Sequence, residues 1–153
     1  MRKRRERQDA IRKIVRRERV RTQRELVDRL KQHGYDCTQA TVSRDIADMG
    51  LRKLPEGVYV LAEDLHLQRM IAELVTSVAR ANNLVLVKCS TGAGAGVGAA
   101  LDGAEFDEVL GSIAGDDTIL ILARTDVDAE LVLDNINKFR GQSLAVPEKG
   151  RTA

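Results

Sequence analysis

Apolar residues recur at helical spacing in three segments of the first fifty residues, and charged side chains fill most positions between them. The three apolar stripes are Ala10, Ile11, Ile14 and Val15, then Leu26, Val27 and Leu30, and finally Val42, Ile46 and Met49. Three short helices with tight connections, the first running to about Glu18, are typical of a helix-turn-helix domain. The hydrophobic pattern therefore predicts an N-terminal domain of this kind.

Residues with helix-capping chemistry stand at the ends of these segments. Thr22, with a glutamate three residues later, has the capping-box spacing, and Gly34 suits the end of that helix. Thr38 is placed to cap the third helix, which Gly50 ends. Residues 1–7 are almost all charged, so we expect them to fray as a solvated tail or to serve as an arm that contacts phosphates.

A hairpin is predicted directly after the third helix. Residues 51–54 and 58–61 flank Pro55-Glu56-Gly57, which has turn chemistry. A hairpin in this position is a wing, and Arg52 and Lys53 on its first strand would lie against a sugar-phosphate backbone.

The face of the third helix opposite its apolar stripe is small and polar with one long cation, so it can enter a major groove. This face consists of Gln39, Ala40, Ser43, Arg44 and Ala47. Arg44 can bind guanine through two hydrogen bonds, Gln39 can bind adenine or a phosphate, and Ser43 can donate to a phosphate. The alternative is an ordinary exposed helix face. The candidate DNA-binding residues are Gln39, Thr41, Ser43, Arg44, Arg52 and Lys53.

The pattern changes beyond the wing. We expect a DNA-binding domain over residues 1–62, a linker over 63–70, a second domain over 71–145 and a tail over 146–153. The predicted elements are a short helix near 67–72 with a strand after it, a hairpin at Asn82-Asn83, paired strands over 106–114 and 118–124, and a helix over 128–139. The glycines of 91–98 lack the spacing of a nucleotide-binding loop, so a helix packed closely on a sheet is favoured there.

Two adjacent carboxylates, Asp116 and Asp117, stand in a turn between two apolar strands. Like charges this close repel, so the pair is stabilised by a nearby cation, either a metal ion or an organic cation such as a guanidinium or ammonium group. The alternative is a solvated acidic turn, because Asp is common in turns for local hydrogen-bonding reasons.

The charge of the chain is divided unevenly along its length. Residues 1–62 contain 17 Lys and Arg against 9 Asp and Glu, a net charge of +8, whereas residues 63–153 contain 8 against 14, a net charge of −6. This asymmetry indicates an N-terminal module that meets a polyanion and a C-terminal module with another role. Each half is small and aliphatic, which favours association of subunits.

Several other classes of protein are disfavoured. No apolar run approaches the ~20 residues of a membrane span, and the arginine-rich start lacks the apolar core of a secretory signal, so we expect a cytoplasmic protein that does not enter a membrane. Cys37 and Cys89 lack metal-ligand spacing, and only His33 and His66 could join them, so we expect neither a zinc site nor a disulfide.

The chain resembles the bacterial arginine repressor family from about Arg4 to Phe139. The resemblance rests on Thr41-Val42-Ser43-Arg44-Asp45, on the wing, and on Gly111-Ser112-Ile113-Ala114-Gly115-Asp116-Asp117-Thr118. It implies an α/β protein of two domains: an N-terminal winged helix-turn-helix and a C-terminal α+β sandwich, an antiparallel sheet with helices, for oligomerisation. It also implies a hexamer made of two trimers, with L-arginine bound between the trimers near the acidic turn.

The resemblance also implies a ligand site with one departure. Asp102, Asp116 and Asp117 match its acidic positions, but Ala95 stands where many family members have Gln, so one polar contact to L-arginine is missing or replaced. The expected function is an arginine-responsive transcriptional regulator that binds palindromic operator DNA and represses arginine biosynthesis genes, with activation of catabolic genes left open. L-Arginine is the co-repressor, and no other cofactor or metal is implied.

Two alternatives compete with this interpretation. One is a winged-helix regulator with a different effector or none. The other is an enzyme of phosphoryl or nucleotidyl transfer in which Asp116 and Asp117 hold Mg²⁺. The chain carries no general base, nucleophile or phosphate loop around that pair, so we expect no enzyme.

Overall fold

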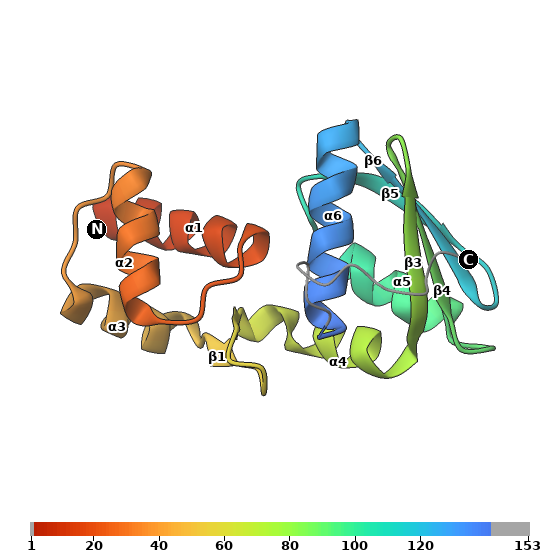
Figure 1. Ribbon diagram of the computed structural model, residues 1–153, viewed down its shortest axis with the longest axis horizontal. Helices are drawn as coiled ribbons and strands as arrows, with labels where there is room; N and C mark the ends of the chain where they lie inside the picture. Colours follow the sequence, from red (N-terminus) through yellow and green to blue (C-terminus); the bar gives the residue numbers. More distant parts are fainter. Residues whose placement is uncertain (1, 142–153) are drawn as a thin grey trace, which may run out of the picture. The chain divides into compact units, whose positions relative to one another are not determined.

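The computed structural model describes residues 2–141, which divide into an N-terminal unit that ends at Leu65 and a C-terminal unit that begins at His66. The elements labelled in Figure 1 and their neighbours are α1 (Arg2–Arg17), α2 (Gln23–Gln32), α3 (Gln39–Met49), β1 (Arg52–Lys53), β2 (Tyr59–Val60), the 3-10 helix η1 (Ala62–Asp64), α4 (Leu65–Leu74), β3 (Val75–Ala81), β4 (Leu84–Cys89), α5 (Gly94–Gly103), β5 (Val109–Ala114), β6 (Thr118–Ala123) and α6 (Asp126–Phe139). The predicted tail and residues 142–145 lie outside the described residues.

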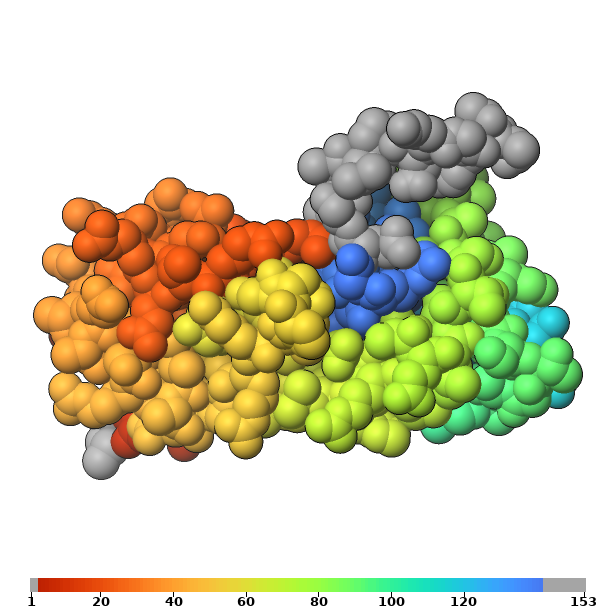
Figure 2. Space-filling view, turned by 60° about the horizontal axis from the view of Figure 1, so that its bottom comes forward, coloured from red at the N-terminus to blue at the C-terminus, as the bar shows by residue number. Residues whose placement is uncertain are grey.

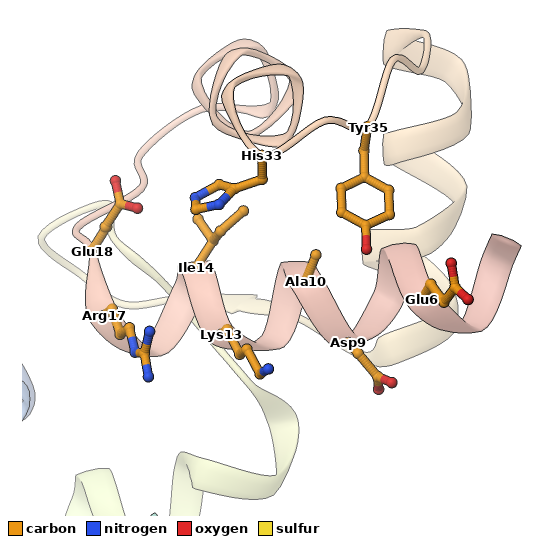
Figure 3. Close-up of a pocket in the computed structure, with 9 residues that line it drawn as sticks. All are labelled: Glu6, Asp9, Ala10, Lys13, Ile14, Arg17, Glu18, His33 and Tyr35. Carbon is orange, nitrogen blue, oxygen red and sulfur yellow. The ribbon is translucent and has the colours of Figure 1, made fainter. Parts of the chain in front are cut away.

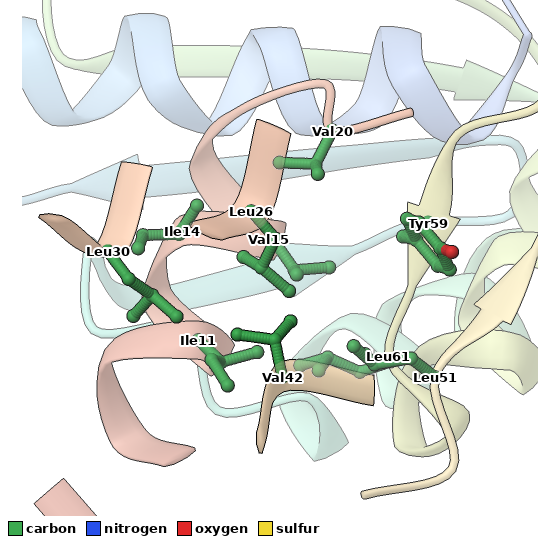
Figure 4. Close-up of a cluster of buried hydrophobic side chains, with 10 residues drawn as sticks. All are labelled: Ile11, Ile14, Val15, Val20, Leu26, Leu30, Val42, Leu51, Tyr59 and Leu61. Atoms are coloured by element: carbon green, nitrogen blue, oxygen red, sulfur yellow. The ribbon is translucent and has the colours of Figure 1, made fainter. Parts of the chain in front are cut away.

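The helices and the wing of the N-terminal unit share one hydrophobic core, which is mostly aliphatic (Figure 4). Its buried members are Ile11, Ile14, Val15, Val20, Leu26, Leu30, Val42, Leu51, Tyr59 and Leu61, with Ala10, Val27, Ile46 and Met49 among the partly buried side chains packed against them. The three predicted apolar stripes are therefore confirmed as the faces that build this core.

The predicted caps are present. The Thr22 hydroxyl accepts a hydrogen bond of 3.0 Å from the Glu25 N–H, and the Thr38 hydroxyl accepts one of 3.2 Å from the Thr41 N–H. Gly50 ends α3 in the left-handed conformation, with a φ of 69°, which favours glycine. The second and third helices thus begin and end where their local chemistry predicts.

The prediction that residues 1–7 fray is wrong for the described part of that segment. Helix α1 starts at Arg2, and its first turns are tied to α3 by ion pairs: Arg4 donates to Asp48 at 2.6 Å, and Arg7 donates to Asp45. These carboxylates stabilise a helical start that would otherwise be a run of repelling cations.

The wing is the predicted hairpin. Strands β1 and β2 are antiparallel, with Arg52 opposite Val60 and Lys53 opposite Tyr59. The Tyr59 N–H donates to the Val20 carbonyl at 2.9 Å, and in the space-filling view the wing, coloured yellow, lies against the end of α1 (Figure 2). The core of the N-terminal unit thereby fixes the base of the wing.

The stretch predicted as a linker is helical. Residues Ala62–Asp64 form η1, and α4 follows at once with Leu67 and Ile71 buried on one side. The short helix expected near 67–72 is confirmed as part of this longer one. No helix within residues 2–141 combines the length and the apolarity needed to cross a membrane.

The C-terminal unit is a four-stranded antiparallel sheet in the order β3-β4-β6-β5, with α5 and α6 on one face (Figure 1). Alternate residues of the two inner strands, such as Val85 and Ile121, are buried beneath these helices. The predicted hairpins at Asn82-Asn83 and at the acidic turn are confirmed. Strand β5 begins at Val109 and not at residue 106, because Phe106 is buried in the loop that follows α5.

The other face of this sheet carries exposed aliphatic side chains. Leu86 on β4, Leu120 and Leu122 on β6 and Ile113 on β5 lie there, and Ile113 is 74% exposed. Leu120 stands opposite both Leu86 and Ile113 in the strand register, so these side chains are neighbours. The unit therefore has one covered face and one open apolar face, which we call the open face.

Candidate functional site

The exposed face of α3 is composed as the sequence predicts. Gln39, Ser43 and Arg44 are exposed, whereas Thr41 is half-buried. The Thr41 hydroxyl lies 3.1 Å from the Thr38 hydroxyl and so belongs to the helix cap. Within residues 2–141, Arg44 forms no hydrogen bond or ion pair, so its guanidinium is available to an external acceptor.

The two cations of the wing, Arg52 and Lys53, are exposed and follow α3 closely in the sequence. Lys53 places its Nζ 5.3 Å from the centroid of the Tyr59 ring, a cation–π contact across the hairpin. Arg21 Nη1 donates to the Glu56 carbonyl in the wing turn at 2.8 Å. The turn is thus held by α2's flanking segment while Arg52 and Lys53 face solvent.

Four arginines of α1, Arg4, Arg7, Arg12 and Arg16, already have acidic partners. Arg12 pairs with Asp9 at 3.1 Å, and Arg16 donates to both Asp64 oxygens at 2.8 and 2.9 Å. The count of 17 Lys and Arg in the N-terminal half therefore overstates the number of cations open to a polyanion, whereas its net charge of +8 already subtracts the acidic residues. The sequence carried no signal that separates paired from unpaired arginines.

The acidic turn joins the edge strand β5 to the inner strand β6. Its Gly115 N–H donates to the Thr118 carbonyl at 2.7 Å. The side chain of the exposed Asp116 accepts a hydrogen bond of 3.3 Å from the Gly92 N–H. The half-exposed Asp117 accepts from the Thr118 hydroxyl at 2.8 Å, and Lys88 Nζ lies 3.8 Å away.

The first turn of α5 packs directly against this acidic turn. The Gly94 N–H donates to the Asp116 carbonyl at 2.8 Å. A Cβ atom at Gly94 would lie 1.9 Å from the Gly115 carbonyl oxygen, so only glycine fits there. The glycine-rich stretch is therefore the close-packed helix that was predicted, and it brings the exposed Ala95 beside the turn.

Asp102 lies at the opposite end of α5. It follows Ala95 by seven residues, or about 10 Å along the helix axis. The exposed Asp102 accepts from the Ser112 hydroxyl at 2.9 Å and borders a pocket of about 370 Å³ with Glu105 and Phe106. Within a single chain the first turn of α5 thus lies against the acidic turn, whereas Asp102 lies at the far end of α5 beside Ser112 of β5.

The electrostatic field of the acidic turn affects a neighbouring thiol. Burial and then the charges of Asp117 and Asp116 raise the pKa of the Cys89 thiol above its usual value. Cys89 and Cys37 are both free thiols. No group of three or more His, Cys, Asp or Glu side chains among residues 2–141 is arranged to hold a metal ion.

A second, larger pocket belongs to the N-terminal unit. It has a volume of about 440 Å³ and lies between α1 and the loop after α2, where Ala10, Ile14, His33 and Tyr35 line it (Figure 3). None of the candidate DNA-binding or ligand-binding residues borders it, so its size does not bear on those assignments.

Both units match known domains. Residues 2–67 match the family described as "Arginine repressor, DNA binding domain", and residues 71–138 match "Arginine repressor, C-terminal domain". The chain belongs to the arginine repressor family. The resemblance inferred from the Ser-Arg pair, the wing and the Gly-Asp-Asp turn is confirmed, as is the fold class.

Curated members of the arginine repressor family cover most of the chain. The arginine repressor of Thermus thermophilus is 46% identical over 140 residues, which are 84% of this chain and 85% of that protein. The arginine repressor of Carboxydothermus hydrogenoformans is 41% identical over 144 residues, covering 87% and 96%. The arginine repressor of Bacillus subtilis is 39% identical over 136 residues, covering 82% and 91%. Because this is a family of repressors, the hypothesis of a magnesium-dependent enzyme is wrong.

Proposed function

We propose that this chain is a cytoplasmic, arginine-responsive transcriptional regulator that binds palindromic operator DNA and represses arginine biosynthesis genes. DNA is bound through α3 and the wing by Gln39, Thr41, Ser43, Arg44, Arg52 and Lys53. L-Arginine is the co-repressor and is bound by Asp102, Asp116 and Asp117, with Ala95 at the edge of the site. The observation that carries the proposal is an exposed recognition face whose one arginine has no partner among the described residues, in a chain of this family.

The first step of the proposal assigns α3 to the major groove. Its exposed side chains are short except for Gln39 and Arg44, so the helix can approach base edges closely. The exposed Arg52 and Lys53 would meet phosphates beside the groove. Thr41, which shares in the helix cap, would contribute by holding the first turn of α3 in place.

Arg44→Ala tests this assignment. A bidentate guanine contact contributes about 1–3 kcal/mol of discrimination, so operator affinity should fall about 5- to 150-fold in a mobility shift, while the melting temperature stays unchanged. Arg12→Ala is the matched control: because Arg12 pairs with Asp9, this variant should lose little operator affinity. Unchanged affinity and sequence preference in Arg44→Ala would contradict the role of α3.

The second step assigns the acidic turn to the co-repressor. Asp116 and Asp117 are accessible, and their contacts within residues 2–141 are with an N–H group, a hydroxyl and a loosely placed lysine. They can therefore accept charge-assisted hydrogen bonds from a guanidinium or an ammonium group. L-Arginine carries both groups. Asp102 lies about two helical turns from Ala95 in the same chain. One ligand would therefore contact Asp102 of one subunit and the acidic turn of another.

The third step assigns the open face to self-association, from trimer to hexamer. Exposed neighbouring side chains such as Leu120 and Ile113 form an apolar surface that favours burial against another copy. Ultracentrifugation of Leu122→Asp should show dissociation, whereas Val127→Asp, which changes an exposed apolar residue on α6, should not. If both variants sediment like the unmodified protein, the open face is not the interface.

Titration calorimetry tests the effector. The proposal predicts heat and saturation with L-arginine, a weaker response to L-lysine and none to L-citrulline, which has the same shape without the guanidinium charge. Binding of Mg²⁺ alone, or an equal response to L-citrulline, would favour a different effector. Silence toward all of them, with operator binding intact, would identify a regulator without an effector.

A further inference from the structure

A buried carboxylate lies next to the proposed base-reading arginine. Asp45 directly follows Arg44 in α3, and it is 1% exposed. Val42 is the other buried residue of α3, and the partly buried Ile46 and Met49 pack against the same core, so the inner face of the helix combines an apolar stripe with one buried charge. A carboxylate is seldom buried to this extent without a cationic partner.

The partners of Asp45 come from the start of α1. Arg7 donates to both carboxylate oxygens, with its Nη2 at 3.0 Å from Oδ1. Gln8 Nε2 also donates to Oδ1, at 3.1 Å. One turn away, Arg4 donates to Asp48 at 2.6 Å, which makes a second, exposed bond between the same two helices.

This hydrogen bonding favours the ionised form of Asp45. Burial by itself would raise the pKa of the Asp45 carboxyl, but the hydrogen bonds from Arg7 and Gln8 and the charges of Arg7 and Arg4 bring it below its usual value. The carboxylate is thus a permanent anion at neutral pH, and the bidentate geometry with Arg7 restricts its orientation.

The position of Asp45 lets it control the rotation of α3 about its own axis. A side chain that reaches about 6 Å from a helix axis moves about 1 Å when the helix rotates by about 10°. Recognition groups must be held within about 0.5 Å of their productive geometry. The apolar contacts of Val42, Ile46 and Met49 constrain this rotation less than a bidentate ion pair does, because apolar contacts are not directional.

We infer that Arg7 and Asp45 are positioning residues for DNA recognition: their buried ion pair sets the rotation of α3 and thereby places Arg44 against the base edges. The inference rests on the DNA-binding role proposed for α3. It assigns the start of α1 to the support of the recognition helix, and Arg7 does not contact DNA itself.

A competing assignment makes Arg7 a direct phosphate contact. The two assignments predict opposite effects for Asp45→Asn. If Arg7 bound phosphate, loss of the competing carboxylate would free its guanidinium, and affinity for any duplex would stay the same or rise. If the pair positions α3, operator affinity falls although the protein has lost a negative charge.

The experiment measures affinity for a palindromic operator and for an unrelated duplex with the full chain. Asp45→Asn should lower operator affinity at least about tenfold, with less than about a threefold loss on the unrelated duplex, which is bound through phosphates alone. Arg7→Gln should lower operator affinity by a similar factor. In the double variant Arg7→Gln, Asp45→Asn, where two amides can pair, the loss should be smaller than the product of the single losses.

Two controls separate positioning from general destabilisation. Asp9→Asn removes an exposed carboxylate from α1 and should change operator affinity less than about twofold. Val15→Ala opens a cavity in the core of the same unit and should lower the melting temperature while leaving the ratio of operator to unrelated-duplex affinity unchanged.

The outcomes are distinct. An unmodified chain that binds no operator refutes the proposed function. An unmodified chain that binds, with equal or tighter binding by Asp45→Asn, refutes only the positioning role. That role is also refuted if Arg7→Gln lowers the slope of log affinity against log salt by about one, as loss of a phosphate contact does. The positioning role is likewise overturned if Asp45→Asn and Val15→Ala change the ratio of operator affinity to unrelated-duplex affinity by the same factor.

Discussion

The carboxylates of the two units differ in what surrounds them. In the N-terminal unit, Asp45 and Asp64 are each 1% exposed, and each receives two hydrogen bonds from one arginine of α1. In the C-terminal unit, Asp116 and Asp117 are accessible, and the nearest lysine or arginine among residues 2–141 is Lys88, 3.8 Å from Asp117.

This difference separates structural from receptive carboxylates. A buried carboxylate whose lone pairs are taken by an internal guanidinium fixes one helix against another. An accessible pair of carboxylates with neutral donors keeps most of its hydrogen-bonding capacity and repels itself until a cation arrives. The internal Arg16–Asp64 contact is the same chemistry that we propose for L-arginine at the acidic turn, supplied there by a ligand.

The largest expected effect is on the structural side. Arg16→Leu leaves Asp64 buried without its main partner and should lower the free energy of unfolding of the N-terminal unit by about 3–5 kcal/mol, measured by urea denaturation with circular dichroism. Arg12→Leu, whose partners Asp9 and Glu63 are exposed, should cost less than about 1 kcal/mol. The double variant Arg16→Leu, Asp64→Leu should recover most of the loss. If Arg16→Leu and Arg12→Leu lower the free energy of unfolding equally, the distinction between buried and exposed carboxylates is wrong.

The next effect is on the receptive side. Asp117→Asn removes a charged acceptor and should weaken L-arginine binding by about 1.5–3 kcal/mol, roughly 10- to 150-fold, in titration calorimetry. The free energy of unfolding should change little, because the side chain is half-exposed. Glu130→Gln, which removes an accessible carboxylate paired with Arg80, is the control. A large loss of stability without a loss of affinity would place Asp117 among the structural carboxylates.

A smaller effect is expected at Ala95. If charge dominates the site, introducing the Gln that the resemblance implies at this position adds one neutral hydrogen bond, so Ala95→Gln should leave L-arginine affinity unchanged or raise it by about 0.5–1.5 kcal/mol. Ala99→Gln, one turn later on the exposed side of α5, should have no effect. Weaker binding by Ala95→Gln would mean that the small residue makes room for the ligand.

The smallest effect concerns Lys88, which donates to the Thr118 hydroxyl at 2.8 Å beside Asp117. Its ammonium partly neutralises the turn, and half-exposed pairs of this kind contribute about 0–1 kcal/mol. Lys88→Met should therefore tighten L-arginine binding slightly, and Lys88→Arg should not. Weaker binding by Lys88→Met would show that this cation assists the ligand and does not compete with it.

The features that the sequence determined are those governed by neighbours within a few residues. The apolar stripes, the caps at Thr22 and Thr38, the wing and the acidic turn all follow from helical or strand periodicity and from turn chemistry. The glycine-rich helix was also predictable, because the spacing of its glycines does not suit a phosphate loop.

Tertiary structure alone decided which charges meet. Arg7 and Asp45 are 38 residues apart and Arg16 and Asp64 are 48 apart, so no local pattern pairs them. The position of Asp45 on the same side of α3 as Val42 was a visible hint of burial, but a charged residue there does not name its partner. The separation of Asp102 from the acidic turn likewise depends on how α5 packs along β5, since the direction of a helix across a sheet is set by side-chain packing over the whole unit.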